Sequence, residues 1–246
     1  MNLLLSTVSF SFDSVANIGM YEETIRKIFL EEFPTINALN APDVVPPEIP
    51  RFVLISHHGF STLVVTSNMI QLTTKFDEAF SSQWEKRCKP YLQKKTVLIS
   101  CFLREIGINV RYTGLTINSL FSTKGSSVQQ IERKFVKQKL IANLDLYDIM
   151  QKQTFVYKDT FFINLQIQNQ RYPDLKLHGF ETVSDVAEDE KCAVLVIDIN
   201  DRKVANKERS YISSEKVLDE IFEINNSFMK FGFESIVSGG ESLCLN

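Results

Sequence analysis

The chain has 246 residues, of which 44% are hydrophobic and 23% charged, and its formal net charge at pH 7 is −3. This is the composition of an ordinary soluble globular protein, and no segment of the sequence approaches the roughly 20 apolar residues of a membrane span. The four cysteines form no C-x-x-C pair and have no metal-ligand spacing, so we expect reduced thiols in a cytoplasmic protein.

The first third of the chain predicts a strand, a helix and a group of short strands. Residues 1–12 have no Lys or Arg ahead of their apolar run and soon alternate, which predicts a strand and not a signal peptide. Residues 21–33 place Ile25 and Phe29 on one helical face, and a proline-rich connector follows at 40–50. Three runs rich in β-branched and aromatic residues then predict an antiparallel meander, at 51–56, 61–67 and 69–76.

A helical pattern from Asp77 to Ile106 leads into the string GINVRYTGLTI at 107–117. Pro90 interrupts the helical pattern, so we expect a kink or two helices in sequence. In the strand that follows, the apolar residues occupy even-numbered positions up to Tyr112 and odd-numbered positions from Leu115, so the apolar pattern changes face at Thr113–Gly114. We therefore predict a β-bulge at that position, where the strand leaves one lobe of the protein and joins the other.

The second half of the chain repeats this pattern of elements without repeating the sequence. A helix is expected first, then strands that include a continuous apolar run typical of a central strand, and then a last helix. The expected elements are a helix at 126–140, strand patterns at 153–170, 176–183 and 192–199, and a helix at 215–236.

The order of these elements favours an α+β fold with two lobes. In each lobe the expected order of elements is strand, helix, three antiparallel strands, helix. We expect the two lobes to be related by a pseudo-twofold axis. The predicted boundary divides the chain into an N-terminal lobe at 1–106 and a C-terminal lobe at 107–246, with one continuous domain as the alternative.

The sharpest enzyme hypothesis is a metal-dependent nuclease. Asp198 ends an apolar strand, Asp201 and Lys203 follow it, and Asp174 lies upstream. In such enzymes the carboxylates hold Mg²⁺ and the lysine steadies the attacking water. The competing interpretation is that the two aspartates after the strand simply form its turn. The three histidines do not form a metal-ligand pattern, so we expect no metal site and no cofactor.

Charge is distributed unevenly, which makes nucleic-acid binding a second hypothesis. Residues 51–139 hold 14 Lys and Arg against 5 Asp and Glu, so the middle of the chain is basic and its ends are acidic. Lys86 and Arg87 lie on one predicted helix, and Arg133 and Lys137 on another, and phosphate contacts need clustered cations of this kind. The competing interpretation is that these side chains are the solvated faces of two helices.

The strings FDEAFSSQWEKRCKPYLQ and GINVRYTGLTI, with LVIDIND further on, resemble a sporadically distributed bacterial family of similar length that is known only by a catalogue designation. The most specific element is the pair Arg111–Tyr112 on the mid-chain strand. The resemblance covers most of the chain and implies architecture more than activity. It associates the chain with toxin neutralisation or defence against phage.

Taken together, the sequence favours a non-enzymatic cytoplasmic protein-interaction module, with an immunity or antitoxin-like role. Its partner is expected to be another protein or a second copy in a homodimer, because an edge strand can pair with another chain. The alternatives are a nucleic-acid-binding protein and, less favoured, the nuclease. We expect Arg111 to be structural, hydrogen-bonding backbone or a carboxylate, with ligand binding as the alternative.

Overall fold

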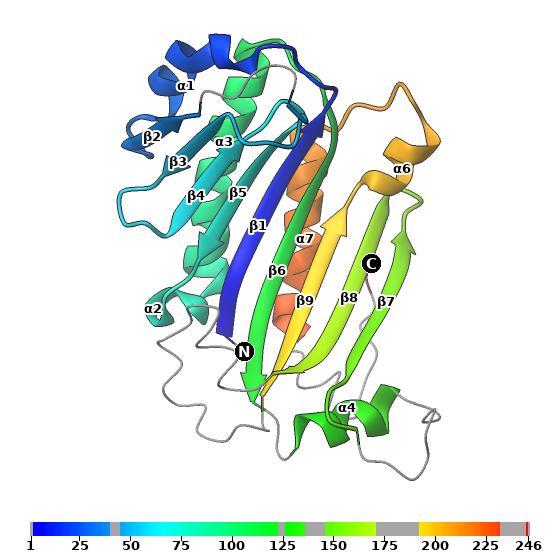
Figure 1. Ribbon diagram of the computed structural model, residues 1–246. Helices are drawn as coiled ribbons and strands as arrows, with labels where there is room; N and C mark the ends of the chain where they lie inside the picture. The colour runs from blue at the N-terminus through cyan, green and yellow to red at the C-terminus, as the bar shows by residue number, and fades with distance from the viewer. Residues whose placement is uncertain are drawn as a thin grey trace.

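The computed structural model describes residues 2–39, 45–122, 126–135, 146–170, 192–231 and 245. Its strands form one antiparallel sheet in the order β2-β3-β4-β5-β1-β6-β9-β8-β7 (Figure 1). The strands are β1 (Asn2–Phe12), β2 (Thr35–Ala38), β3 (Phe52–Ile55), β4 (Ser61–Val65), β5 (Met69–Lys75), β6 (Val110–Ser122), β7 (Met150–Tyr157), β8 (Phe161–Gln170) and β9 (Cys192–Asn200). The helical segments are η1 (Ile18–Tyr21), α1 (Glu22–Phe29), α2 (Glu78–Ser81), η2 (Trp84–Cys88), α3 (Lys89–Glu105), α4 (Ser127–Phe135), α6 (Arg202–Lys207) and α7 (Glu215–Phe231).

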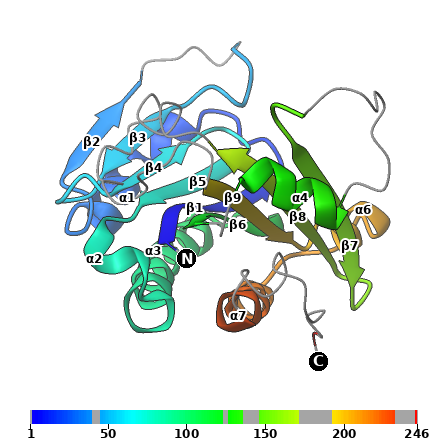
Figure 2. The same ribbon diagram turned by 90° about the horizontal axis from the view of Figure 1, so that it is seen from below.

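The two long helices, α3 and α7, pack on the same side of the sheet (Figures 1 and 2). Alternate residues of each strand face these helices and form the main core. On the central strands Val8, Ile117 and Ile197 are at most 1% exposed, and they share one cluster with Phe102 of α3 and Phe222 of α7. The mixed class of helices and antiparallel sheet expected from the sequence is therefore confirmed. No helix in the described residues is long and apolar enough to cross a membrane.

The strand β6 contains a bulge, but not where the sequence predicted it. Pairing with β1 runs without interruption through Thr113 and Gly114, so the bulge predicted there is wrong. The register shifts between Tyr112 and Val110, which makes Arg111 the extra residue. An extra residue reverses the alternation of side chains, and this is why the apolar positions of the strand change parity. β1 and β9 flank this strand on its two sides, and both pair with its residues 114–120.

The helical region at 77–106 is divided, and the division precedes Pro90. The chain forms α2, then a turn of π-helix in η2, and then α3, with Pro90 in the first turn of α3. A proline is tolerated there because the first helical amides have no intrahelical acceptor in any case. Of the two alternatives expected here, a kink or helices in sequence, the structure has helices in sequence, and Pro90 lies at the start of the last one.

The predicted meander is confirmed as β3, β4 and β5, but β2 was not predicted. The strand pattern at 153–170 belongs to the hairpin of β7 and β8, whose turn holds Lys158 and Asp159 with positive φ. The strand expected at 176–183 lies outside the described residues. The lobe boundary expected after residue 106 falls between α3 and β6, and strands from both sides of it join in one sheet.

Candidate functional site

A row of polar side chains crosses the open face, by which we mean the face of the sheet turned away from α3 and α7. Each strand contributes one residue, and successive members are paired in register. Six members are threonines, and Ile55 is the one apolar member. From β2 to β7 this threonine row consists of Thr35, Ile55, Thr62, Thr73, Thr7, Thr116, Asp198, Asn164 and Thr154.

Threonine suits this position for two physical reasons. Its branched β-carbon favours extended backbone and leaves few rotamers to the side chain. Threonines directly across from each other on neighbouring strands also support one another through cross-strand contacts. In the middle of the sheet Thr7, Thr73 and Thr116 are half-buried, so the row is a firm polar surface.

The carboxylate of Asp198 is fixed within the row by neutral donors. Thr116 Oγ1 donates to Asp198 Oδ1 at 3.2 Å, and the side-chain amides of Asn164 and Asn200 donate to Oδ2 at 2.8 and 3.2 Å. Asn164 in turn accepts a hydrogen bond from Thr154 Oγ1 at 2.7 Å. No cation takes part in these bonds, so the charge of Asp198 is oriented by hydrogen bonds and remains on the open face.

The neighbouring row contains Gly114, which is flanked in register by Ser9 on β1 and Asn200 on β9. A Cβ atom at Gly114 would lie 3.2 Å from Asn200 Cβ and 3.3 Å from Ser9 Oγ. The glycine therefore allows these two polar side chains to approach each other over the centre of the sheet.

The open face carries little charge. Apart from Arg111 at one end, the charged strand residues that the structure describes on this face are Lys75, Lys152 and Asp198. The other side chains are mainly hydroxyls, amides and aliphatic groups, and at one end of the face Leu120 and Val194 belong to a small buried apolar cluster. A surface of this kind offers many hydrogen-bonding groups and no strong field of one sign.

At one end of this face the predicted pair Arg111–Tyr112 makes two different contacts. Arg111 Nη1 donates to the backbone oxygen of Arg209, and its Nε lies 3.9 Å from the Asp13 carboxylate. The Tyr112 ring lies 5.0 Å from the guanidinium carbon of Arg202. Arg111, the bulge residue, thus ties the segment before α7 to the start of β6.

Beneath this end, Asp201 is a fully buried carboxylate. Its Oδ1 accepts from the Thr113 backbone N–H at 2.7 Å, and its Oδ2 accepts from the Tyr211 hydroxyl at 2.8 Å. Burial raises the pKa of Asp201 above its ordinary value, and hydrogen bonds from Ser213, Thr113 and Tyr211 partly offset that rise. The pKa of Tyr211 is also raised, by burial and by the Asp201 carboxylate.

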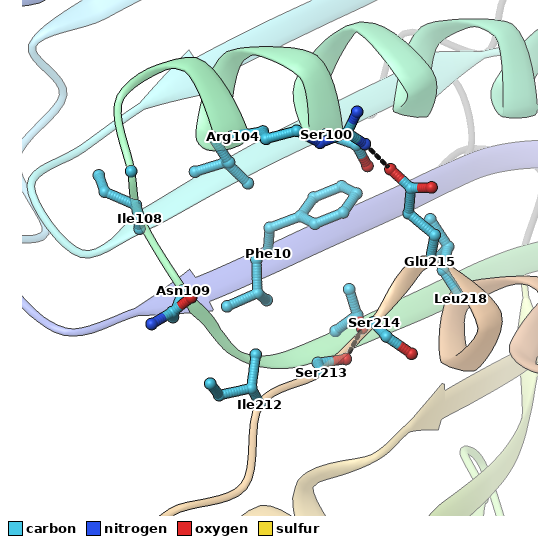
Figure 3. A pocket seen from close by; sticks show the side chains of 14 residues that line it. Phe10, Ser100, Arg104, Ile108, Asn109, Ile212, Ser213, Ser214, Glu215 and Leu218 are labelled. Atoms are coloured by element: carbon cyan, nitrogen blue, oxygen red, sulfur yellow. Dashed lines mark hydrogen bonds and ion pairs between the residues drawn. The ribbon is translucent and has the colours of Figure 1, made fainter.

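A pocket of about 310 Å³ lies on the helical side, between the end of α3, the start of β6 and the segment before α7 (Figure 3). Phe10 forms part of its apolar lining. Arg104 donates to Glu215 at 2.6 Å, and the side chains of both are more than half exposed. The hydroxyls of Thr113 and Ser213 lie 2.6 Å apart. In each of these two pairs the polar groups satisfy one another.

The residues of the nuclease hypothesis are not gathered into one site. Asp198 lies on the open face among neutral donors, whereas Asp201 is buried with Thr113, and Lys203 lies in α6. Asp174 lies outside the described residues. Within the described ranges no group of three or more His, Cys, Asp or Glu is placed to hold a metal ion.

The cations of the basic segment are dispersed, and several form internal contacts. Lys86 is exposed on η2, the guanidinium carbon of Arg87 lies 5.0 Å from the centre of the Phe80 ring, and Arg133 is exposed on α4. Lys137 lies outside the described residues.

On α3, Lys94 and Lys95 both bind the carboxylate of Glu32, and Lys89 Nζ lies 2.5 Å from Glu223 Oε1. The positive charge of this helix is therefore largely compensated within the protein.

Sequence reasoning missed the threonine row. Its local signal is the recurrence of threonine or serine at alternate positions, as in Thr7 and Ser9. That signal does not say which strands are neighbours. A scan against models of protein families and a search of curated proteins found no match to this chain.

Proposed function

We propose that this chain is a non-enzymatic protein-interaction module and that a partner protein binds its open face. The threonine row is the observation that carries this proposal, because it runs in register across the whole sheet and is polar at every position but Ile55. Helices cover the opposite face, so the open face is the broad surface on which a partner can be received.

The chemistry of the row suits a protein partner. Threonine and serine lose little side-chain entropy when they are immobilised, so docking costs less than on a surface of long flexible side chains. The hydroxyls and amides serve as both donors and acceptors. Asp198, held by Thr116 and Asn164, is a pre-oriented acceptor for a donor group of the partner.

Nucleic acid is the second candidate, favoured by the excess of Lys and Arg at 51–139. It is less well supported, because phosphate binding needs several cations on one surface. The open face offers Lys75 and Lys152 on different strands, and on α3 the charges of Lys94 and Lys95 are taken up by Glu32.

The expected pseudo-twofold relation of two lobes is part of the same proposal. Its support is the sheet order, in which β1 and β6 are adjacent at the centre. From each of them the chain goes to an outer strand and returns strand by strand, through β2 to β5 in one half and β7 to β9 in the other.

The family resemblance adds a biological setting to the proposal. An immunity or antitoxin-like protein neutralises its target by covering it, and a wide sheet face with few charges is suited to that task. The cytoplasmic location and the defence-associated role remain predictions.

The proposal is tested by placing a charged side chain on the open face. Ser9→Arg changes a half-buried position beside Gly114, and Ser14→Arg makes the same change at an exposed position after β1. Tagged wild-type protein and both variants are expressed in the native host and recovered with bound material, with nuclease treatment of half of each sample.

We expect wild type and Ser14→Arg to retain one stoichiometric protein after nuclease treatment, and Ser9→Arg to lose it while keeping its melting temperature. If Ser9→Arg recovers as much of that protein as wild type does, the partner binds a surface other than the open face. Recovery of nucleic acid alone, lost on nuclease treatment, would replace the proposal by the second candidate.

A further inference from the structure

The two edge strands of the sheet are unequal. β2 has four residues and begins directly after Pro34, which is the short, proline-guarded edge that protects proteins from unwanted pairing. β7 has eight residues and no proline. In the part of the chain that the structure describes, β7 pairs with β8 alone. Among the described strands, one edge of the sheet is therefore guarded, and the other has a strand on one side only.

The exposed side chains of β7 support the same conclusion. Met150, Phe155 and Val156 are 60%, 46% and 53% exposed, which is unusual for apolar residues of a strand. Lys152 is the one charged residue of the strand. A long, exposed edge strand without proline, half of whose residues are apolar, is a template for another strand.

We infer that β7 pairs with β7 of a second copy of this chain, antiparallel about a two-fold axis that passes beside Gln153 and is perpendicular to the sheet. Two nine-stranded sheets are thereby joined into one. The interface is isologous, as in most homodimers, because the same strand is used on both sides.

The register follows from side-chain alternation and charge. Residues opposite each other in an antiparallel pair lie on the same face, so the axis must pass beside a residue and not between two. An axis beside Lys152 would set two lysines face to face, and one beside Thr154 would set Lys152 against Val156. On the open face, an axis beside Gln153 sets Met150 against Val156 and Lys152 against Thr154, which pairs apolar with apolar and polar with polar. On the other face it sets Gln151 against Phe155.

The same register is favourable at the two ends of the strand. Asp148 lies just before β7 and Lys158 just after it, and this register places Asp148 of one copy opposite Lys158 of the other. Lys158 is half exposed and already lies 2.7 Å from Glu220, and Asp148 accepts a hydrogen bond from the Asn169 amide at 3.0 Å. The two-fold axis repeats this pairing of opposite charges at both ends.

This inference does not rest on the proposed function, since it concerns the edge and not the open face. It has a consequence for that face all the same. An axis perpendicular to the sheet leaves both open faces on the same side, so the dimer presents two threonine rows to one side.

The register is tested by disulfide crosslinking at single positions of β7, in protein with Cys101→Ser and Cys244→Ser to remove background thiols. Directly opposed residues have Cα atoms about 4.5–5.5 Å apart, within the range that a disulfide spans. Residues one step from the axis meet their own copies only diagonally, at roughly 7–8 Å. We expect Gln153→Cys to crosslink several-fold faster than Lys152→Cys or Thr154→Cys. Equal rates, or a maximum at another position, would overturn the register.

The pairing itself is tested by opposite charges at one position. In this register residue 154 of one copy lies opposite Lys152 of the other, so Thr154→Lys creates two repulsive lysine pairs and Thr154→Glu creates two attractive pairs. Both variants lose the same hydrogen bond to Asn164. Sedimentation equilibrium should show a dimer for wild type, about tenfold weaker association for Thr154→Lys, and unchanged or tighter association for Thr154→Glu.

A wild type that stays monomeric at its highest soluble concentration would overturn the inference, as would equal weakening by both Thr154 variants. Ser9→Arg should leave the dimer intact. The two proposals can therefore fail separately. A wild type that dimerises but recovers no partner protein contradicts only the proposed function, and one that recovers a partner but stays monomeric contradicts only the β7 dimer.

Discussion

Asp201, just after β9, accepts a hydrogen bond from the backbone N–H of Thr113 on β6 at 2.7 Å, and the carboxylate is wholly buried. With the Tyr211 hydroxyl on its other oxygen, it holds the segment before α7 against the end of the sheet. The nuclease hypothesis makes Asp201 a metal ligand, whereas its contacts give it a structural role.

The buried Asp201 carboxylate predicts a characteristic dependence of stability on pH. Because its pKa is raised in the folded state, the unfavourable burial of charge is present above that pKa and is relieved as pH falls through it. Asp201→Asn removes this titration. In urea unfolding, the stability of wild type relative to Asp201→Asn should therefore decrease as pH rises from acid to neutral. Parallel pH profiles would contradict this account.

The ion pair of Glu32 with Lys95 predicts the opposite pH dependence. The pKa of Glu32 is lowered from 4.5 to about 2, by hydrogen bonds from Lys94 and Lys95. Its contribution is thus complete above the ordinary pKa of a glutamate and is lost as pH falls toward 2. We expect Glu32→Gln to lower the free energy of unfolding at pH 7 by about 3 kcal/mol, because Lys95 is 3% exposed and loses its counter-charge.

The exposed Lys94 supplies the control for that experiment. Lys94→Gln removes an exposed partner of the same carboxylate and should cost much less stability than Glu32→Gln, because water screens an exposed ion pair. Equal losses for Lys94→Gln and Glu32→Gln would show that burial of Lys95 is not what makes the pair important.

Arg111 is expected to contribute to stability through its bond to the backbone oxygen of Arg209. Arg111→Ala should lower the free energy of unfolding by about 1–2 kcal/mol, measured by urea or thermal unfolding. Arg209→Ala is the matched control, because it keeps the backbone oxygen and should be nearly neutral. An Arg111→Ala protein of unchanged stability that no longer binds its partner would instead give Arg111 a functional role.

The cysteines should differ sharply in reactivity. Cys88 is buried, and burial raises the pKa of its thiol to about 12, while Cys101 is exposed on α3. Because the thiolate is the nucleophile, iodoacetamide should modify Cys101 in the native protein and leave Cys88 unmodified until the protein unfolds. Peptide mass mapping against a Cys101→Ser control measures this, and early labelling of Cys88 would show that its surroundings open readily.

Several features of this protein are determined by local sequence alone. The alternation of Ile163, Leu165 and Ile167 with Asn164 and Gln166 indicates the buried face of β8, and the apolar run at 192–199 indicates a central strand, β9. The runs of the meander were found because β-branched residues favour extended backbone wherever they occur. These signals depend on side-chain period and propensity, which a few neighbouring residues suffice to define.

The site and the edges were decided by the tertiary structure. Thr7, Thr73 and Thr116 form one row because packing of the opposite face sets the register of three strands that are distant in sequence. The bulge at Arg111 left a change of parity in the sequence, but its position depends on the strand that it pairs with. Which strands become edges depends likewise on the order of the whole sheet. Local period specifies which residues face inward, and only long-range pairing specifies which of them become neighbours.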